Sequence, residues 1–98
     1  MSVYVRLLLA AEAYAIPVEH VREVADLGAV TPVPGSGPEV LGVRNLRGRI
    51  LPVLDLGFLL GVPRAAPPGR LLVAEAGDRE AGFAINEVTW VGELPDPA

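Results

Sequence analysis

The stretch that most constrains the fold of this chain is residues 40–61, VLGVRNLRGRILPVLDLGFLLG, in which Arg47-Gly48 joins two apolar runs. Glycine at the second position of a two-residue loop is a strong hairpin signal, because that position requires a positive φ. We therefore predict a β-hairpin with strands over residues 41–46 and 49–54. In that register Leu46 lies opposite Arg49, and Leu41 lies opposite Leu54.

Alternation along the predicted strands divides the hairpin side chains between two faces. One face carries Leu41, Val43, Asn45, Ile50, Pro52 and Leu54, and the other carries Gly42, Arg44, Leu46, Arg49, Leu51 and Val53. Both faces are apolar at the base and polar only near the tip, which predicts a hairpin inside the domain rather than at its rim. Pro52 cannot donate a ladder hydrogen bond, so we expect it at an edge, at a bulge or facing outward.

The rest of the chain predicts short strands with one or two helical turns. We expect strands at residues 3–10, 14–16, 70–76 and 79–85, an extended piece at 29–33, a loop at 34–38, a stiff linker at 64–69 and a tail from Pro95. Residues 18–26, VEHVREVAD, have apolar side chains at helical spacing and predict a short helix. Asp55 is placed to cap a second helical turn over residues 56–60, which Gly61 would end. Residues 86–91 fit either a helix or an extended segment. The sequence thus predicts an all-β fold.

A weak internal repeat relates Tyr14-Ala15-Ile16 to Phe83-Ala84-Ile85, 69 positions later. Each motif follows a Leu- and Ala-rich segment and precedes spaced valines. Chance similarity among short apolar strands is one interpretation. The other is a fold of two related lobes, of which the second is incomplete because the chain stops at Ala98.

Composition limits the chain to one domain over residues 1–98, with no disulfide frame because cysteine is absent. No apolar run is long enough to cross a bilayer, and the N-terminus lacks a signal-peptide pattern, so we expect a cytoplasmic protein that does not insert into membranes. A net charge of −4 and only five aromatic residues argue against a nucleic-acid surface.

The sequence shows no recognisable set of catalytic residues. His20 is the single histidine, and no nucleophile accompanies it, so a structural role is the simpler interpretation. The carboxylates fall near turns and strand ends, and none forms an evident acid–base pair. We therefore predict no catalytic, metal or cofactor site.

The hairpin tip carries the residues that do not fit a plain core: Arg44, Asn45, Arg47 and Arg49. One interpretation is that they are ordinary solvent-exposed polar residues around a turn. The other is that they form a recognition surface that bridges carboxylates of a partner protein. Trp90, the one tryptophan, is more typical of a core position than of an interface.

Residues 42–56, GVRNLRGRILPVLDL, resemble the signature of the CheW-like domain family, roughly Gly-x-x-Asn-Leu-Arg-Gly-x-x-x-Pro-x-x-Asp-Leu. The stretches around residues 14–24, 31–34 and 71–91 resemble the family's flanking segments in the same order. The resemblance implies two small β-barrel lobes around a shared core, here with the first lobe centred on 14–61, the second on 70–91 and an N-terminal strand at 3–10.

The resemblance also implies a non-catalytic adaptor that couples the cytoplasmic tip of a chemoreceptor to the regulatory domain of a CheA-type histidine kinase. Arg47 and Gly42 fall on signature positions tied to partner binding, and Val21 and Glu23 fall on a segment near a partner-facing surface. Arg44 and Arg49 are expected to join that interface, whereas the hairpin is expected to be supported by Asn45, Gly48 and Asp55.

One departure concerns the C-terminus, where the family has a further stretch that this chain lacks. We expect open strand edges as a result, covered by a self-partner in a homo-oligomer, by another chain or by a rearrangement. Two other functions stay open on the sequence. One is a small β-barrel module for a ligand or an oligonucleotide, and the other is a CheW-like adaptor for surface motility.

Overall fold

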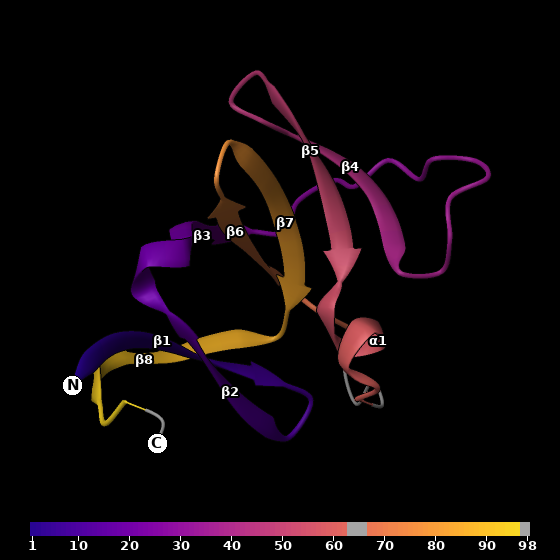
Figure 1. Cartoon of the computed structure of the whole chain (residues 1–98). Helices are drawn as coiled ribbons and strands as arrows, with labels where there is room; N and C mark the ends of the chain where they lie inside the picture. Colours follow the sequence, from indigo (N-terminus) through magenta and orange to yellow (C-terminus); the bar gives the residue numbers. More distant parts are fainter. Residues whose placement is uncertain (63–66, 97–98) are drawn as a thin grey trace.

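A computed structural model describes residues 1–62 and 67–96 of the chain (Figure 1). Its elements are β1 (Ser2–Leu9), β2 (Glu12–Pro17), the 3₁₀ turn η1 (Val18–His20), β3 (Val21–Asp26), β4 (Val40–Leu46), β5 (Arg49–Asp55), α1 (Leu56–Leu60), β6 (Arg70–Ala76), β7 (Arg79–Ile85) and β8 (Glu87–Leu94). The all-β prediction is confirmed. None of the described helices is long and apolar enough to span a membrane.

The strands form two sheets, one of three strands in the order β2-β1-β8 and one of five in the order β3-β6-β7-β5-β4. All pairs are antiparallel except β5 with β7. β8 pairs along β1, which brings the start of β1 beside the end of β8 (Figure 1). The ranges 14–61 and 70–91 are the predicted centres of two lobes. Each contributes strands to both sheets, because β2 and β8 belong to the three-stranded sheet and the other strands of these ranges to the five-stranded one.

Two buried clusters fill the domain, and β6 lies between them. One cluster comprises Leu46, Leu51, Val53, Leu71, Val73 and Ala84, and the other comprises Leu7, Leu9, Leu72 and Ile85. Leu71, Leu72 and Val73 are consecutive and all buried, so alternate side chains of β6 serve opposite clusters. A strand covered on both faces reads as a continuous apolar run, as this one does.

The central hairpin has the predicted register near its tip, from Leu46 opposite Arg49 to Val43 opposite Pro52. Arg47 and Gly48 both have positive φ, 51° and 87°, as a tight two-residue turn requires. The predicted pairing of Leu41 with Leu54 is wrong, because a register shift between Val40 and Gly42 places Val40 opposite Leu54.

The prediction that the hairpin lies inside the domain is also wrong. β4 is an end strand of the five-stranded sheet, and only one face of the hairpin is fully buried, since Leu41, Val43 and Leu54 on the other face are half-buried. Ile50, on the other face, is 62% exposed. Pro52 also faces outward, one of the three placements expected for it.

The short helix after the hairpin forms as predicted. The backbone N of Phe58 donates to Oδ1 of Asp55 at 3.1 Å, so Asp55 is the N-cap of α1. Gly61 follows the last turn with a left-handed φ of 72°, the conformation that ends many helices at glycine.

The predicted helix over residues 18–26 is wrong, because the chain forms only η1 there before entering β3. Every second residue of β3 is half-buried, namely Val21, Glu23 and Ala25. The charged Glu23 therefore interrupts the apolar alternation that would have indicated a strand. Residues 86–91, left open between helix and strand, fall mostly in β8. Trp90 is 42% exposed, so its predicted core position is wrong. Part of the linker predicted at 64–69, and the end of the tail predicted from Pro95, lie outside the described residues.

Both copies of the weak repeat begin as antiparallel hairpins, β1 with β2 and β6 with β7. Each hairpin turns through a residue with positive φ, Ala10 in the first and Gly77 in the second. The copies then diverge, because the first continues into η1 and β3 and the second into β8. Asn86 joins the copies, since its Oδ1 accepts from the backbone N of Ala10 at 2.8 Å.

Candidate functional site

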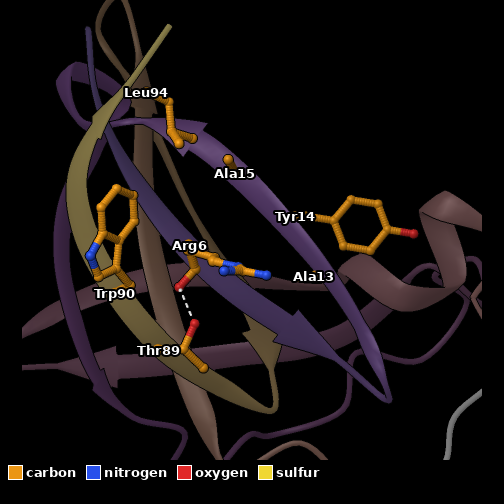
Figure 2. Close-up of a pocket in the computed structure, with 7 residues that line it drawn as sticks. All are labelled: Arg6, Ala13, Tyr14, Ala15, Thr89, Trp90 and Leu94. Atoms are coloured by element: carbon orange, nitrogen blue, oxygen red, sulfur yellow. Dashed lines mark hydrogen bonds between the residues drawn. The ribbon is translucent and has the colours of Figure 1, made fainter.

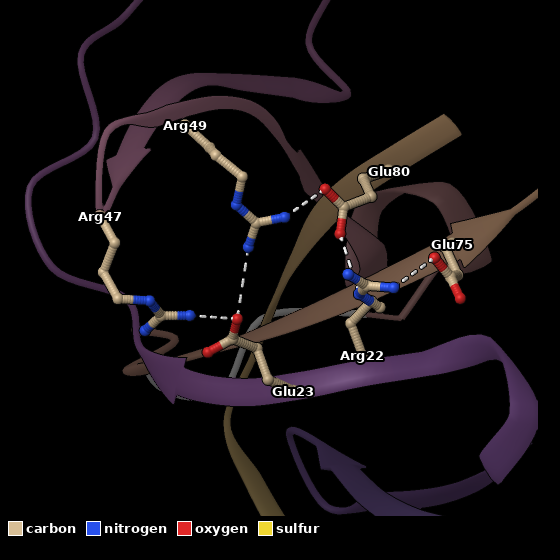
Figure 3. Close-up of polar contacts among 6 residues, drawn as sticks. All are labelled: Arg22, Glu23, Arg47, Arg49, Glu75 and Glu80. Carbon is tan, nitrogen blue, oxygen red and sulfur yellow. Dashed lines mark hydrogen bonds and ion pairs between the residues drawn. The ribbon is translucent and has the colours of Figure 1, made fainter. Parts of the chain in front are cut away.

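Six charged side chains form an alternating row across the five-stranded sheet, which we call the charged strip (Figure 3). The strip consists of Arg22 and Glu23 on β3, Arg47 and Arg49 at the β4–β5 turn, and Glu75 and Glu80 near the β6–β7 turn. β3 pairs with β6, and β7 lies between β6 and β5. The strand order therefore brings together residues that are distant in the sequence.

The contacts run in one chain of opposite charges. Arg22 Nη1 lies 3.2 Å from Glu75 Oε2, and Arg22 Nε lies 3.4 Å from Glu80 Oε2. Glu80 Oε1 pairs with Arg49 Nη1, and Arg49 Nη2 lies 3.4 Å from Glu23 Oε1. Glu23 Oε1 also accepts a hydrogen bond from Arg47 Nη2. Three cations and three anions thus balance one another along the strip.

The end of the strip at the hairpin turn is its most accessible part. The side chain of Arg47 is 64% exposed, whereas that of Glu23 is 27% exposed. The hydrogen bond from Arg47 lowers the pKa of Glu23, and the charges of Arg47, Arg49 and Arg22 act in the same direction against desolvation. Of the guanidinium nitrogens of Arg47, only Nη2 contacts another of the described residues. The other nitrogens are therefore available to another molecule.

A sequence profile of the CheW-like domain matches residues 4–96, which include the whole charged strip. The chain belongs to the CheW-like domain family. The CheW-like resemblance of residues 42–56 is confirmed by this match.

The curated proteins that the chain resembles include proteins named CheW and proteins with other names. The chain is 38% identical over 81 residues to "Chemotaxis protein CheW" of Thermotoga maritima, an alignment that covers 82% of this chain and 54% of the relative. It is 38% identical over 82 residues to "Protein FrzA" of Myxococcus xanthus, covering 82% and 51%. It is 36% identical over 84 residues to "Protein PilI" of Pseudomonas aeruginosa, covering 84% and 47%. The chain spans about half the length of these relatives.

The fold is also similar to a solved CheW structure. The crystal structure of the scaffolding protein TtCheW from Thermoanaerobacter tengcongensis matches with a TM-score of 0.88 and 28% sequence identity. The match covers 95% of this chain and 65% of that one. The arrangement of the two sheets is therefore that of a CheW protein.

Two of the residues assigned to the CheW-like interface have clear packing roles. Gly42 is buried, and its backbone neighbour Val43 exchanges two hydrogen bonds of 2.9 Å with Thr31. Arg44 Nε donates to the carbonyl of Leu27 at 2.8 Å, and its guanidinium lies against Gly28. Both residues tie the loop before β4 to the hairpin, and a direct contact with a partner stays a prediction for them.

The remaining predicted residues lie at the hairpin or next to it. Asn45 Oδ1 accepts from the backbone N of Gly48 at 2.9 Å, which braces the turn that presents Arg47. Val21 is half-buried, packs against the second core cluster and precedes Arg22 and Glu23. Asp55 caps α1 and lies at the far end of β5 from the turn.

Sequence reasoning missed Arg22, Glu75 and Glu80 as members of the charged strip. Arg22 and Glu75 are separated by 53 positions, and Arg49 and Glu80 by 31. No local pattern links them, because strand order alone makes them neighbours. In residues 1–62 and 67–96 the structure shows no cluster of three or more His, Asp or Glu side chains that could hold a metal ion.

Proposed function

We propose that this CheW-like chain is a non-catalytic adaptor that couples chemoreceptor-type proteins to a CheA-type histidine kinase in the cytoplasm. The observation that carries the proposal is the exposed Arg47, held by Glu23 at the tip of a braced hairpin in a family whose members include chemotaxis and scaffolding proteins. Relatives named FrzA and PilI match comparably well, so the proposed role is adaptor function in chemotaxis-like signalling, with surface motility as an alternative pathway.

Preorganisation explains how such a tip could serve docking. The turn conformation, the Asn45 brace and the Glu23 contact limit the positions that Arg47 can adopt before a partner arrives. Ordering a long side chain on binding costs about 0.5–1.5 kcal/mol, and a prepositioned side chain avoids part of that cost. The unengaged donors of Arg47 suit a carboxylate of the partner, because guanidinium and carboxylate can form two parallel hydrogen bonds.

The interface residues divide by role in this proposal. Arg47, Glu23 and Val21 face or border the partner. Arg49 contacts the same oxygen of Glu23 as Arg47 does, while Gly42 and Arg44 tie the hairpin to the loop before β4. The partners proposed are the regulatory domain of the kinase and the cytoplasmic tip of the receptor. Family membership favours this role over a ligand- or oligonucleotide-binding module.

Binding to an isolated CheA-type regulatory domain and to a receptor-tip fragment tests the proposal. Arg47→Gln should weaken binding to at least one of them by roughly tenfold, the loss expected when a charged hydrogen-bond donor is removed. Arg79→Gln is the matched control, because Arg79 is also exposed at a hairpin turn but lies outside the charged strip. Equal affinities for the wild type and Arg47→Gln, measured by calorimetry, would contradict the role of Arg47.

We also propose self-association through the three-stranded sheet. In the described residues β2 and β8 are its end strands, and exposed strand edges favour pairing with another chain. Val91 lies opposite the buried Val5 and is nevertheless 58% exposed, so apolar surface on the core-facing side is uncovered. Sedimentation should show a concentration-dependent dimer that Val91→Glu weakens, and a monomer at every concentration would refute this arrangement.

A further inference from the structure

A groove of about 590 Å³ lies on the three-stranded sheet, away from the charged strip (Figure 2). Arg6 on the middle strand is paired in register with Ala15 on one side and Trp90 on the other. Figure 2 shows the Arg6 side chain between Trp90 and the Ala13–Tyr14 edge, with Leu94 farther along β8. The groove therefore extends over all three strands on the outer face of the sheet.

Trp90 forms the apolar wall of this groove. A Cβ atom added at Gly92 would lie only 2.7 Å from Cε2 of the indole, so the ring rests directly on the glycine backbone. That contact holds the indole over the sheet while 42% of the residue stays exposed. Exposed tryptophans with a fixed orientation are favoured as anchors in recognition sites, because they contribute a large apolar area with little loss of freedom.

Arg6 supplies the only charge among the side chains that line the groove. Among the described residues, its guanidinium makes no ion pair or side-chain hydrogen bond, although the chain carries 12 acidic residues. Five other arginines have polar partners in the structure: Arg22, Arg44, Arg47, Arg49 and Arg70. An unpaired guanidinium beside an indole is suited to bind a carboxylate whose neighbour is apolar.

We propose that the groove binds an extended peptide segment of a partner protein that carries an Asp or Glu next to a large apolar side chain. The carboxylate pairs with Arg6, and the apolar side chain packs on Trp90 and Leu94. An extended peptide fits because the groove is only partly enclosed and is lined by residues of all three strands of one sheet, whereas sites for small molecules enclose most of their ligand. This binding site is independent of the charged strip and of the adaptor role.

Trp90 is the only tryptophan in the chain, so its emission reports directly on the groove. The probe is the peptide acetyl-Ala-Leu-Asp-Phe-Glu-Leu-Ala-amide, and its control has Asn and Gln in place of Asp and Glu. Titrating the full chain with the acidic peptide should change the emission saturably. Arg6→Gln should weaken binding roughly tenfold. The Asn/Gln peptide should show a similar loss with the wild type.

Arg79→Gln serves as the charge-matched control, because Arg79 has no polar partner among the described residues and lies on β7, outside the sheet that carries the groove. It should bind the acidic peptide as the wild type does, and so should Arg47→Gln. The proposal is overturned if Arg6→Gln binds like the wild type, if both peptides bind equally, or if Arg79→Gln loses as much affinity as Arg6→Gln. The proposal is also overturned if titration with the acidic peptide gives neither a heat of binding in calorimetry nor a change in Trp90 emission. Unchanged circular dichroism of each variant excludes unfolding as the cause.

Discussion

Substitution of Gly42 by alanine tests whether this position serves packing. A Cβ atom added at Gly42 would lie 2.6 Å from the carbonyl carbon of Thr31 and closer still to its oxygen. These are backbone atoms, which cannot move aside as a flexible side chain would. The φ of Gly42 is 147°, in a region that L-residues rarely adopt.

The expected loss follows from two contributions. Forcing a methyl group into a filled site costs about 1–3 kcal/mol through displaced backbone. Separating residue 31 from the hairpin also breaks the two hydrogen bonds between Thr31 and Val43, each worth about 0.5–1.5 kcal/mol net. Gly42→Ala should therefore lower the free energy of unfolding by about 3 kcal/mol, a large fraction of the 5–15 kcal/mol typical of a domain.

Urea unfolding followed by Trp90 emission measures this loss. Gly69→Ala is the control, because a Cβ there meets no atom within 4 Å and the residue has no left-handed φ. The control should be within about 0.5 kcal/mol of the wild type, as for most surface substitutions. If Gly42→Ala is as stable as Gly69→Ala, the packing role is refuted. If it then binds partners weakly at full stability, Gly42 belongs to the interface itself.

Two further predictions concern single side chains. Asp55→Ala should lower the free energy of unfolding by about 1 kcal/mol in the same assay because it removes the cap of α1, and an unchanged midpoint would contradict that role. Glu23 has a pKa below its ordinary value of 4.5, so its ion pairs stabilise the fold at neutral pH and are lost as the pH falls through the lowered pKa. Arg47→Gln should raise the pKa of Glu23 toward 4.5 in an NMR titration of the carboxyl carbon, and no change would show that the contact with Arg47 is absent in solution.

Features set by local chemistry could be predicted from the sequence. The Arg47-Gly48 turn, the strands on either side of it and the Asp55 cap depend on residues within a few positions of one another. The prediction of an interior hairpin failed because apolar alternation does not show whether another element packs against a given face of the hairpin. Ile50 is as apolar as a core residue, yet it lies 62% exposed beside the turn, on the outer face of the hairpin.

The error over residues 18–26 and the missed half of the charged strip have the same physical origin. Read as a strand, the segment places Glu23 on the half-buried face with Val21 and Ala25, which breaks the apolar alternation expected of a strand. The conflict disappears only when Arg47 and Arg49 from another hairpin compensate the carboxylate. A residue that breaks a local rule because a distant partner balances it is typical of a functional position. Glu23 therefore misled the prediction of secondary structure for the same reason that it belongs to the proposed docking surface.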